Sequence, residues 1–385
     1  MLEQGVLQGV TVLDLSRLLP GPYCSMLLAD HGARVIAVEG QSPGDFFVSQ
    51  VYRNKEHICL DLKSEPGLAV FLQLAAQADV ILEGFRPGVA GRLGVDYRSV
   101  RRVNPEVVYC SLTGYGQSGP GSEKAGHDVN YLAVSGVLDL LGLREASPSI
   151  PGVQFADLAG GLNAALGIIL ALLHRGRTGK GQYIDISIAD CSLALLPLVQ
   201  HLEQSSGQKL SRGDNLLSHR YACYNVYETL DQRYLALGAL EGKFWQRLCR
   251  HLGLQELIPL QFDESRRQEV VQTLRRIFKQ KALAVWQQEL GELDICITPV
   301  QSLQEAQQDP LFLQRDMIPE KKGPGQESKQ GLGVQIKLQR TPGSVRNPAP
   351  GFGQDTCKVL QELGYSKQEI EGLLQQGVCG GTSRE

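Results

Sequence analysis

The sequence predicts an α/β protein, with a large domain built on a Rossmann-like parallel sheet flanked by helices and a smaller α+β domain. Over the first 115 residues, short apolar runs alternate with helical stretches. That order is typical of βαβ units with right-handed crossovers. From about residue 221 the pattern changes to an antiparallel pair of strands followed by helices. The length of 385 residues also favours more than one domain.

Six apolar runs of the large domain predict strands, at 9–15, 33–39, 58–62, 79–83, 107–112 and 183–187. Helical spacing predicts helices at 23–29, 67–78, 158–174 and 188–204. Ligands of such sheets bind at the carboxyl ends of the strands. The loops after Glu39, Leu62, Glu83 and Leu112 are therefore the candidate binding loops.

The predicted domain boundaries follow the composition of the chain. Residues 1–204 form the first part of the large domain, and a polar linker covers 205–220. The small domain spans 221–330. Residues 331–385 return to the large domain and add two closing helices, with a disordered tail from about 377.

Composition narrows the possible functions. The net charge of −3 favours neither nucleic acid nor an anionic membrane as a partner. The longest apolar run, 164–173, is too short to span a bilayer. Nine scattered cysteines without a Cys-x-x-Cys pair predict reduced thiols and a cytoplasmic protein. The glycine fingerprint of nicotinamide-binding proteins does not follow the first strand.

Two side chains stand out as candidates for proton transfer. His127 follows a glycine-rich stretch, and imidazole can both accept and return a proton near neutral pH. Asp157 precedes a long apolar helix, where it is either an N-cap or a base or nucleophile. The pair Gly160-Gly161 suggests that something packs closely against the first turn of that helix. Glu241, between a strand and a helix, is either a cap or the partner of a second carboxylate.

Basic residues could together bind an anion with several phosphates. Arg86 is the strongest candidate for binding the anion, because it lies on a tight turn at the end of a predicted strand. The other clusters contain Arg53 with Lys55, Lys63, and Arg98 with Arg101 and Arg102.

Several motifs in combination resemble the CaiB/BaiF family, the class III CoA transferases and α-methylacyl-CoA racemases. The resemblance covers about residues 8 to 320, and its motifs include 19–22, 60–63, 83–88, 114–120, 156–157, 178–182 and 298–300. Within the family, 126–131 and 238–241 are most similar to the racemase branch. The resemblance implies an acyl-CoA racemase that inverts the α-carbon of 2-methylacyl-CoA thioesters through an enolate.

The same resemblance assigns roles to residues. His127 and Asp157 would be the two bases, with Glu241 hydrogen-bonded to Asp157. In the alternative, a CoA transferase, Asp157 forms an aspartyl-CoA thioester. A third alternative is a CoA-binding protein without activity. The implied CoA contacts are Leu60, Asp61, Leu62, Lys63, Arg86, Gly126, Asp128, Asn130 and Tyr131. An interlaced homodimer is expected, with acyl-CoA as substrate and no metal or tightly bound cofactor.

The sequence departs from the family in two places. Ala37 stands where the family usually has a basic residue that touches the nucleotide, so Arg34 or Arg53 is expected to take that role. Residues 218–222 replace a Gly-Gly-Ala-Pro run that borders the acyl pocket in racemases.

For the enolate oxygen, we expect backbone N–H groups at the start of the Leu158 helix to act as donors.

Overall fold

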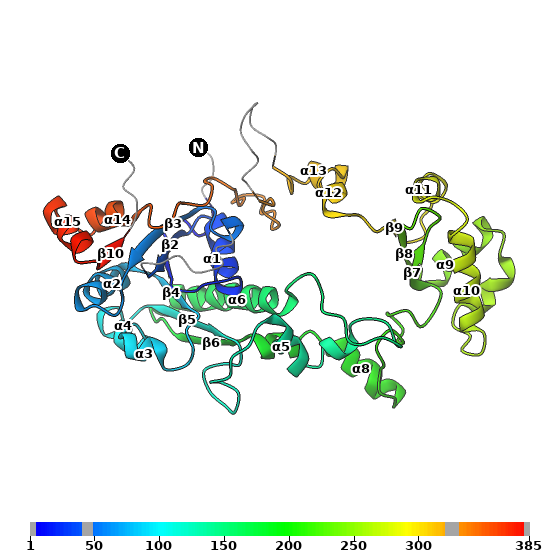
Figure 1. The fold of residues 1–385 in the computed structure, drawn as a ribbon, viewed down its shortest axis with the longest axis horizontal. Helices are drawn as coiled ribbons and strands as arrows, with labels where there is room; N and C mark the ends of the chain where they lie inside the picture. Colours follow the sequence, from blue (N-terminus) through cyan, green and yellow to red (C-terminus); the bar gives the residue numbers. More distant parts are fainter. Residues whose placement is uncertain (1–4, 41–48, 320–330, 381–385) are drawn as a thin grey trace. The chain divides into compact units, whose positions relative to one another are not determined.

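The computed structural model describes residues 5–40, 49–319 and 331–380. The chain divides into two compact units (Figure 1). The first unit comprises residues 1–135, 152–195 and 310–385, and the second comprises 136–151 and 196–309. The second unit therefore takes up an excursion, 136–151, that lies within the predicted large domain, and the chain rejoins the first unit at 310, before the predicted 331.

A seven-stranded sheet forms the centre of the first unit (Figure 1). Its order is β10-β3-β2-β1-β4-β5-β6, and every neighbouring pair is parallel except β10 with β3. The strands are β1 Thr11–Asp14, β2 Arg34–Glu39, β3 Lys55–Leu60, β4 Val80–Glu83, β5 Val108–Thr113, β6 Tyr183–Ser187 and β10 Cys379–Gly380. The order 3-2-1-4-5-6 of the parallel strands is that of the Rossmann fold, which confirms the predicted fold class.

Helices cover both faces of this sheet. The helices of the first unit are α1 Pro20–Asp30, α2 Glu65–Gln77, α3 Val89–Leu93, α4 Tyr97–Val103, α5 Asp128–Val134, α6 Phe155–Thr178, α7 Ile188–Leu193, α13 Pro310–Gln314, α14 Thr356–Glu362 and α15 Lys367–Gln375. Residues of α2, α4, α14 and α15 share one buried cluster with the strands, whereas α1 and α6 pack against the sheet and against each other. Alternate strand residues therefore reach two separate apolar layers.

Helix α6 is longer than the predicted 158–174, and it carries apolar side chains on its buried face and also on its exposed face. By length and composition it could cross a membrane, yet it packs against α1, α7 and β5. Besides Phe155, its first residue, five large apolar side chains on it are nevertheless 37–57% exposed: Leu162, Leu166, Ile169, Leu170 and Leu173. Their spacing of four, three, one and three residues places them on one face, which we call the α6 stripe.

The C-terminal residues of the described chain are ordered against β3, which corrects the predicted disorder from 377. Cys379 pairs with Leu60 and Gly380 with Cys59 in antiparallel register. An edge strand carries unpaired N–H and C=O groups, and β10 covers them. The segment before α14 is also held, because the Asn54 side chain donates to the Ser344 carbonyl at 2.9 Å and accepts the Arg346 N–H at 2.7 Å.

The second unit is an α+β structure with a core of its own. Its elements are α8 Pro197–Ser206, β7 Tyr224–Glu228, β8 Tyr234–Gly238, α9 Gly242–His251, α10 Arg267–Phe278, α11 Leu283–Leu290, β9 Ile297–Pro299 and α12 Leu303–Ala306. The antiparallel pair β7–β8 is present as predicted, and β9 adds a third strand that the sequence pattern did not predict. Trp245 and Trp286 are buried in the core beneath this sheet.

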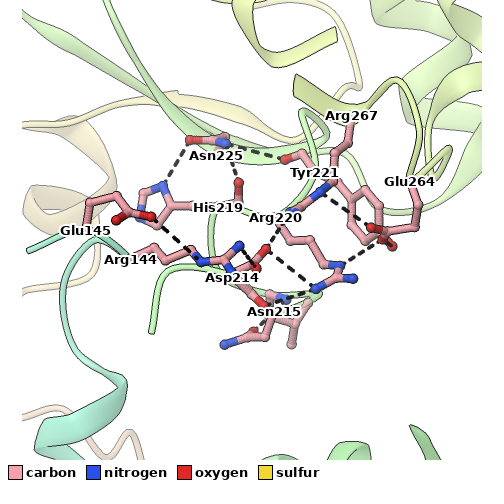
Figure 2. Close-up of polar contacts among 11 residues, drawn as sticks. Arg144, Glu145, Asp214, Asn215, His219, Arg220, Tyr221, Asn225, Glu264 and Arg267 are labelled. Carbon is pink, nitrogen blue, oxygen red and sulfur yellow. Dashed lines mark hydrogen bonds and ion pairs between the residues drawn. The ribbon is translucent and has the colours of Figure 1, made fainter. Parts of the chain in front are cut away.

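The predicted linker, 205–220, is part of this second unit and carries an ion cluster around the buried Asp214 (Figure 2). Asp214 is 8% exposed and contacts three guanidinium groups, from Arg144, Arg220 and Arg267. These cations hold the pKa of Asp214 below its usual range, although burial acts to raise it. Because Arg144 belongs to the excursion 136–151, Asp214 ties that excursion to α10 within the second unit.

Candidate active site

A cavity of about 310 Å³ lies at the carboxyl end of the sheet in the first unit. Its walls include residues that follow β1, from Ser16 to Gly21, and residues that follow β4, from Gly84 to Pro87. Strands β1 and β4 are neighbours, and from them the chain order runs outward in opposite directions. Such a switch point is where doubly wound sheets bind ligands. Of the predicted loops, those after Glu83 and Leu112 line the cavity, and the loop after β1 is an addition.

His127 and Asp157 line this same cavity. Arg86, Gly126 and Tyr131 also belong to its wall. The side chain of His127 is exposed and that of Asp157 is half-buried. The structure thus brings together the two candidate bases, 30 positions apart along the chain, with one of the candidate CoA-binding cations.

Two tyrosine rings fix the loop that presents His127. A Cβ on Gly114 would lie 2.5 Å from the Tyr131 ring, and one on Gly126 would lie 2.7 Å from it. The Tyr131 hydroxyl donates to the Gly126 carbonyl at 2.6 Å, and Tyr115 packs edge-on against Tyr131. The glycines are therefore required by the packing of this ring, and the result is a defined position for His127, the N-cap residue of α5.

Asp128 joins the His127 loop to the helix of Asp157. Its buried carboxylate accepts the N–H groups of Ala156 at 2.8 Å and Asp157 at 3.1 Å. Helix α6 begins at Phe155, so Asp157 lies inside the first turn and is not the N-cap. The Leu158 N–H donates to the Gln154 carbonyl. The backbone donors that we expected for the enolate oxygen are thus already engaged, which corrects that expectation.

Asp128 and Asn130 hold the site in place, and their predicted contacts with CoA stay predictions. Asn130 accepts the His127 N–H at 3.0 Å through its side-chain oxygen. A carboxylate at the first turn of α6 also satisfies orphan N–H groups and interacts favourably with the helix dipole. Tyr131 and Gly126 keep their places in the cavity wall.

The carboxyl group of Asp157 has a raised pKa. Burial acts most strongly to raise it, the neighbouring Asp128 carboxylate adds to the rise, and His127 acts to lower it, so that together they bring the pKa from 3.8 to about 6. A base with a pKa near the working pH combines a useful ionised fraction with an adequate driving force for proton transfer. Asp157 is thereby tuned toward the role of a general base or acid.

Replacing Asp128 with Asn should move the pH dependence of Asp157 without unfolding the site. The amide keeps an acceptor oxygen for the N–H groups of Ala156 and Asp157 but removes the negative charge, so the pKa of Asp157 should fall. The acid limb of the profile of activity against pH should shift to lower pH by about one unit. The profile of Asp128→Asn against wild type measures this shift; an acid limb at an unchanged pH contradicts the coupling.

The pair Gly160-Gly161 is explained by packing between helices. A Cβ on Gly161 would lie 2.6 Å from the Pro20 carbonyl oxygen of α1, and one on Gly160 would lie 2.9 Å from Ile188. What approaches these glycines is therefore protein, from α1 and α7. The close approach of α1 brings the loop after β1 to the cavity beside Asp157.

Three cations line the cavity: Arg17, Arg86 and Lys124. All three are exposed, and none forms an ion pair with another residue in the described part of the chain. The Arg86 loop is braced by the buried Glu83, which accepts the Phe85 N–H at 2.7 Å. Neither Arg17 nor Lys124 was predicted from the sequence, although Arg17 lies two residues before the distinctive motif at 19–22.

Arg34 and Arg53, the two residues predicted to contact the nucleotide of CoA, both form ion pairs within the protein. Arg53 is buried and binds Asp30 with its Nη2 at 2.6 Å, so it has a structural role in place of the predicted one. Arg34 pairs with Glu56 at 2.7 Å and with Glu362 of α14. Neither lines the cavity.

Leu60, Asp61, Leu62 and Lys63 also lie outside the cavity wall. Leu60 is buried in the core, and the Asp61 carboxylate accepts the Lys63 N–H at 3.0 Å in the turn before α2. Lys63 is exposed at that turn, so its predicted contact with CoA stays a prediction.

Glu241 is the N-cap residue of α9 in the second unit, and its exposed side chain makes no capping hydrogen bond. The capping interpretation is therefore wrong, and the predicted pairing with Asp157 stays a prediction. Gln261 donates to the carbonyls of Ala239 and Leu240 and so fixes the approach to Glu241.

Loop 218–222, whose sequence differs from that of the racemases, borders a cavity of about 410 Å³ within the second unit. His219 lines this cavity with a positive φ of 59°, and its Nδ1 lies 3.0 Å from the Asn225 Oδ1 (Figure 2). Arg220 binds Glu264 at 2.8 Å. The residues that replace the usual run are thus held by specific polar contacts.

Comparison with known proteins identifies relatives along nearly the whole chain. A family model described as CoA-transferase family III matches residues 7–356. The human α-methylacyl-CoA racemase is 37% identical over 370 residues, covering 95% of this chain and 96% of the racemase. The mouse succinyl-CoA:glutarate CoA-transferase is 33% identical, covering 97% and 90%. A CaiB/BaiF family protein from Brucella suis has a TM-score of 0.81 at 28% identity, covering 94% of this chain and 100% of that one.

The protein is thus an α/β chain with a ligand cavity at its switch point, and it belongs to CoA-transferase family III, which confirms the predicted family. Both racemases and CoA transferases are among its relatives. The family handles CoA thioesters, and a CoA thioester as substrate is consistent with the cationic wall of the cavity.

Proposed function

We propose that this protein is an acyl-CoA racemase that inverts the α-carbon of 2-methylacyl-CoA thioesters. The observation that carries the proposal is that His127 and Asp157 line one cavity, with the pKa of Asp157 raised to about 6. A proton on the carbon next to a thioester is weakly acidic, and its exchange needs a base and an acid on opposite faces. The identity of 37% with two mammalian α-methylacyl-CoA racemases supports this choice.

In this mechanism one base removes the α-proton and the electron pair moves into the thioester carbonyl, which gives an enolate. The conjugate acid on the other face then returns a proton to the carbon. Asp157 serves one face and His127 the other. Burial and the neighbouring Asp128 keep Asp157 basic enough to accept a proton near neutral pH.

The anionic part of CoA would be held by the cations of the wall. Arg17, Arg86 and Lys124 come from three separate loops and can contact several phosphate oxygens. A cavity of about 310 Å³ suits the acyl group and the thioester, with the rest of CoA extending along the surface.

Incubation of a chiral 2-methylacyl-CoA in D2O tests the proposal. Deuterium should enter the α-carbon, and the optical purity of the thioester should fall. No deuterium and no loss of optical purity would exclude a racemase.

CoA transfer between carboxylic acids is the second candidate, supported by the transferases among the relatives and by the partly buried Asp157 carboxylate. Asp157 would then form an aspartyl-CoA thioester, which hydroxylamine should trap. An adduct at Asp157 without α-deuteration would favour this alternative, and binding of CoA with neither result would indicate a CoA-binding protein without activity.

We also propose that the protein is a homodimer that uses the α6 stripe. Five apolar side chains on one helix face, each at least 37% exposed, form a surface that a second copy can bury. The stripe lies on the helix that carries Asp157, so association would also support the site.

The double substitution Leu166→Glu with Leu170→Glu should convert the dimer to a monomer. Both leucines are 57% exposed, and burying two carboxylates at an apolar interface is strongly unfavourable. Light scattering should give twice 42.1 kDa for the wild type and 42.1 kDa for the variant. Gln268→Glu with Gln272→Glu, at two exposed positions of α10 in the second unit, is the matched control and should stay a dimer. A wild-type mass of 42.1 kDa contradicts the proposal.

A further inference from the structure

A lysine is buried beside the loop that follows β1. The Lys55 side chain is fully buried, and its Nζ donates to the Ser25 hydroxyl at 2.6 Å and to the Pro22 carbonyl at 2.9 Å. The same Nζ lies 3.4 Å from the Asp14 carboxylate, which is also buried. Such a pair is a weak source of stability, because desolvation offsets much of the Coulomb attraction. What it does provide is a fixed link, here between β3, β1 and the first turns of α1.

The Asp14 carboxylate extends this link into the cavity wall. One of its oxygens accepts both the backbone N–H of Ser16, at 2.9 Å, and the Ser16 hydroxyl. The Ser16 side chain also packs against two glycines. A Cβ on Gly21 would lie 2.0 Å from the Ser16 Oγ, and one on Gly84 would lie 3.5 Å from the Ser16 Cβ. Ser16 is therefore held in place by β1, by α1 and by the loop after β4.

Arg17 follows Ser16 directly and is one of the three exposed cations of the cavity wall. Its Nη2 lies 3.6 Å from where a Cβ on Gly40 would be, so its guanidinium group lies at the carboxyl end of β2. On this strand Ala37 replaces the usual basic residue, and the two arginines expected to compensate for it form ion pairs elsewhere. Arg17 thus brings a cation to the end of the strand that lacks one.

We propose that Lys55, Asp14 and Ser16 are positioning residues that hold Arg17 in place for a phosphate group of CoA. None of the three touches the phosphate. They act through the backbone next to Arg17, which the two bonds from Ser16 to Asp14 restrain. A fixed backbone lowers the entropy cost of binding, because fewer conformations are lost when the side chain meets its ligand. The inference rests on the proposed function only through the binding of CoA, which the racemase and the transferase have in common.

Ser16→Ala removes one of the two bonds to Asp14 and leaves the ion pair intact, so this variant should fold. Its Kd for CoA, measured by titration calorimetry, should rise about 10-fold, the loss expected when a charged hydrogen bond is weakened. Its Kd for pantetheine, which lacks the phosphates, should equal that of the wild type. Lys55→Met removes the charge that Asp14 faces and should raise the Kd for CoA at least as much. A wild-type Kd for CoA in either variant, or an equal rise for pantetheine, would overturn the proposal.

A double-mutant cycle with Arg17 separates positioning from any other effect of Ser16. Arg17→Ala should by itself raise the Kd for CoA about 10-fold. Adding Ser16→Ala to Arg17→Ala should raise it by less than about 2-fold more, because the cation that Ser16 positions is already gone. If the two effects multiply in full, Ser16 acts on CoA independently of Arg17 and the proposal is overturned.

Asn104→Ala is the matched control for loss of stability. The Asn104 side chain donates to the carbonyls of Ala75 and Ala78, at 2.9 and 2.7 Å, at the amino end of the sheet. This variant should lower the melting temperature, as Ser16→Ala does, and should leave the Kd for CoA unchanged. A rise in Kd equal to that of Ser16→Ala would mean that lower stability alone weakens binding, and would overturn the proposal. A wild-type protein that does not bind CoA would instead overturn the proposed function, and this inference with it.

Discussion

Replacing Asp157 with Asn is expected to abolish inversion, to slow α-proton exchange in the enantiomer whose proton faces Asp157, and to stabilise the fold at the same time. Loss of a general base costs about 10²–10⁴-fold in rate, and here one face of the α-carbon loses its base entirely. The stability effect follows from the pKa, which is about 6 in the folded protein against 3.8 ordinarily. The folded state therefore disfavours the ionised form, and the stability that the protonated carboxyl contributes is lost as the pH rises from about 4 through 6.

The asparagine removes that penalty. Because Asp157 is partly exposed and screened by water, the gain at pH 8 should be about 1–2 kcal/mol, or a few degrees in melting temperature. The difference between variant and wild type should vanish below about pH 4. Asp190→Asn, in the first turn of α7 and exposed, is the matched control that should keep both rate and stability. Equal melting temperatures for Asp157→Asn and wild type at pH 8 would contradict the claim that the ionised Asp157 carboxylate destabilises the folded protein.

Replacing His127 with Gln is expected to block inversion while leaving exchange in one enantiomer. Glutamine keeps polarity near the cavity but cannot take up the α-proton, so the enantiomer whose proton faces His127 should lose exchange by about 10²–10⁴-fold. The opposite enantiomer should still exchange its α-proton through Asp157, with retention of configuration, because no acid remains on the other face.

Separate deuterium-exchange rates for the two enantiomers measure this asymmetry. His174→Gln, an exposed histidine on α6, should leave both rates unchanged. Equal losses for both enantiomers in His127→Gln would mean that His127 positions the substrate without serving as a base. Retention of CoA transfer by this variant, with an adduct on Asp157, would favour the transferase.

The sequence predicted the parallel sheet because each strand is a short apolar run bounded by a turn or helix signal, as at 79–83 and 107–112. It also selected His127, Asp157 and Arg86, which the fold brings to one cavity. These residues lie at strand ends and helix starts, where local patterns carry information. Their convergence, in contrast, depends on strand order, which family resemblance supplied in part.

What the sequence did not reveal depends on contacts between distant segments. The bonds of Asp128 to the first turn of α6 are visible only once the two segments meet. The sequence does not show that Arg53 forms an ion pair with the buried Asp30, which lies 23 positions earlier in the chain. The excursion 136–151 joins the second unit through Asp214, a residue of the predicted linker. No local pattern encodes such pairings.

A crystal structure with a non-exchanging analogue of 2-methylacyl-CoA bound is the most direct test of the central claim. The α-carbon should lie between His127 and Asp157, with a ring nitrogen and a carboxylate oxygen each about 3–3.5 Å away on opposite faces. If the Asp157 oxygen instead faces the carbonyl carbon, and His127 is turned away from the acyl group, two-base proton transfer is wrong.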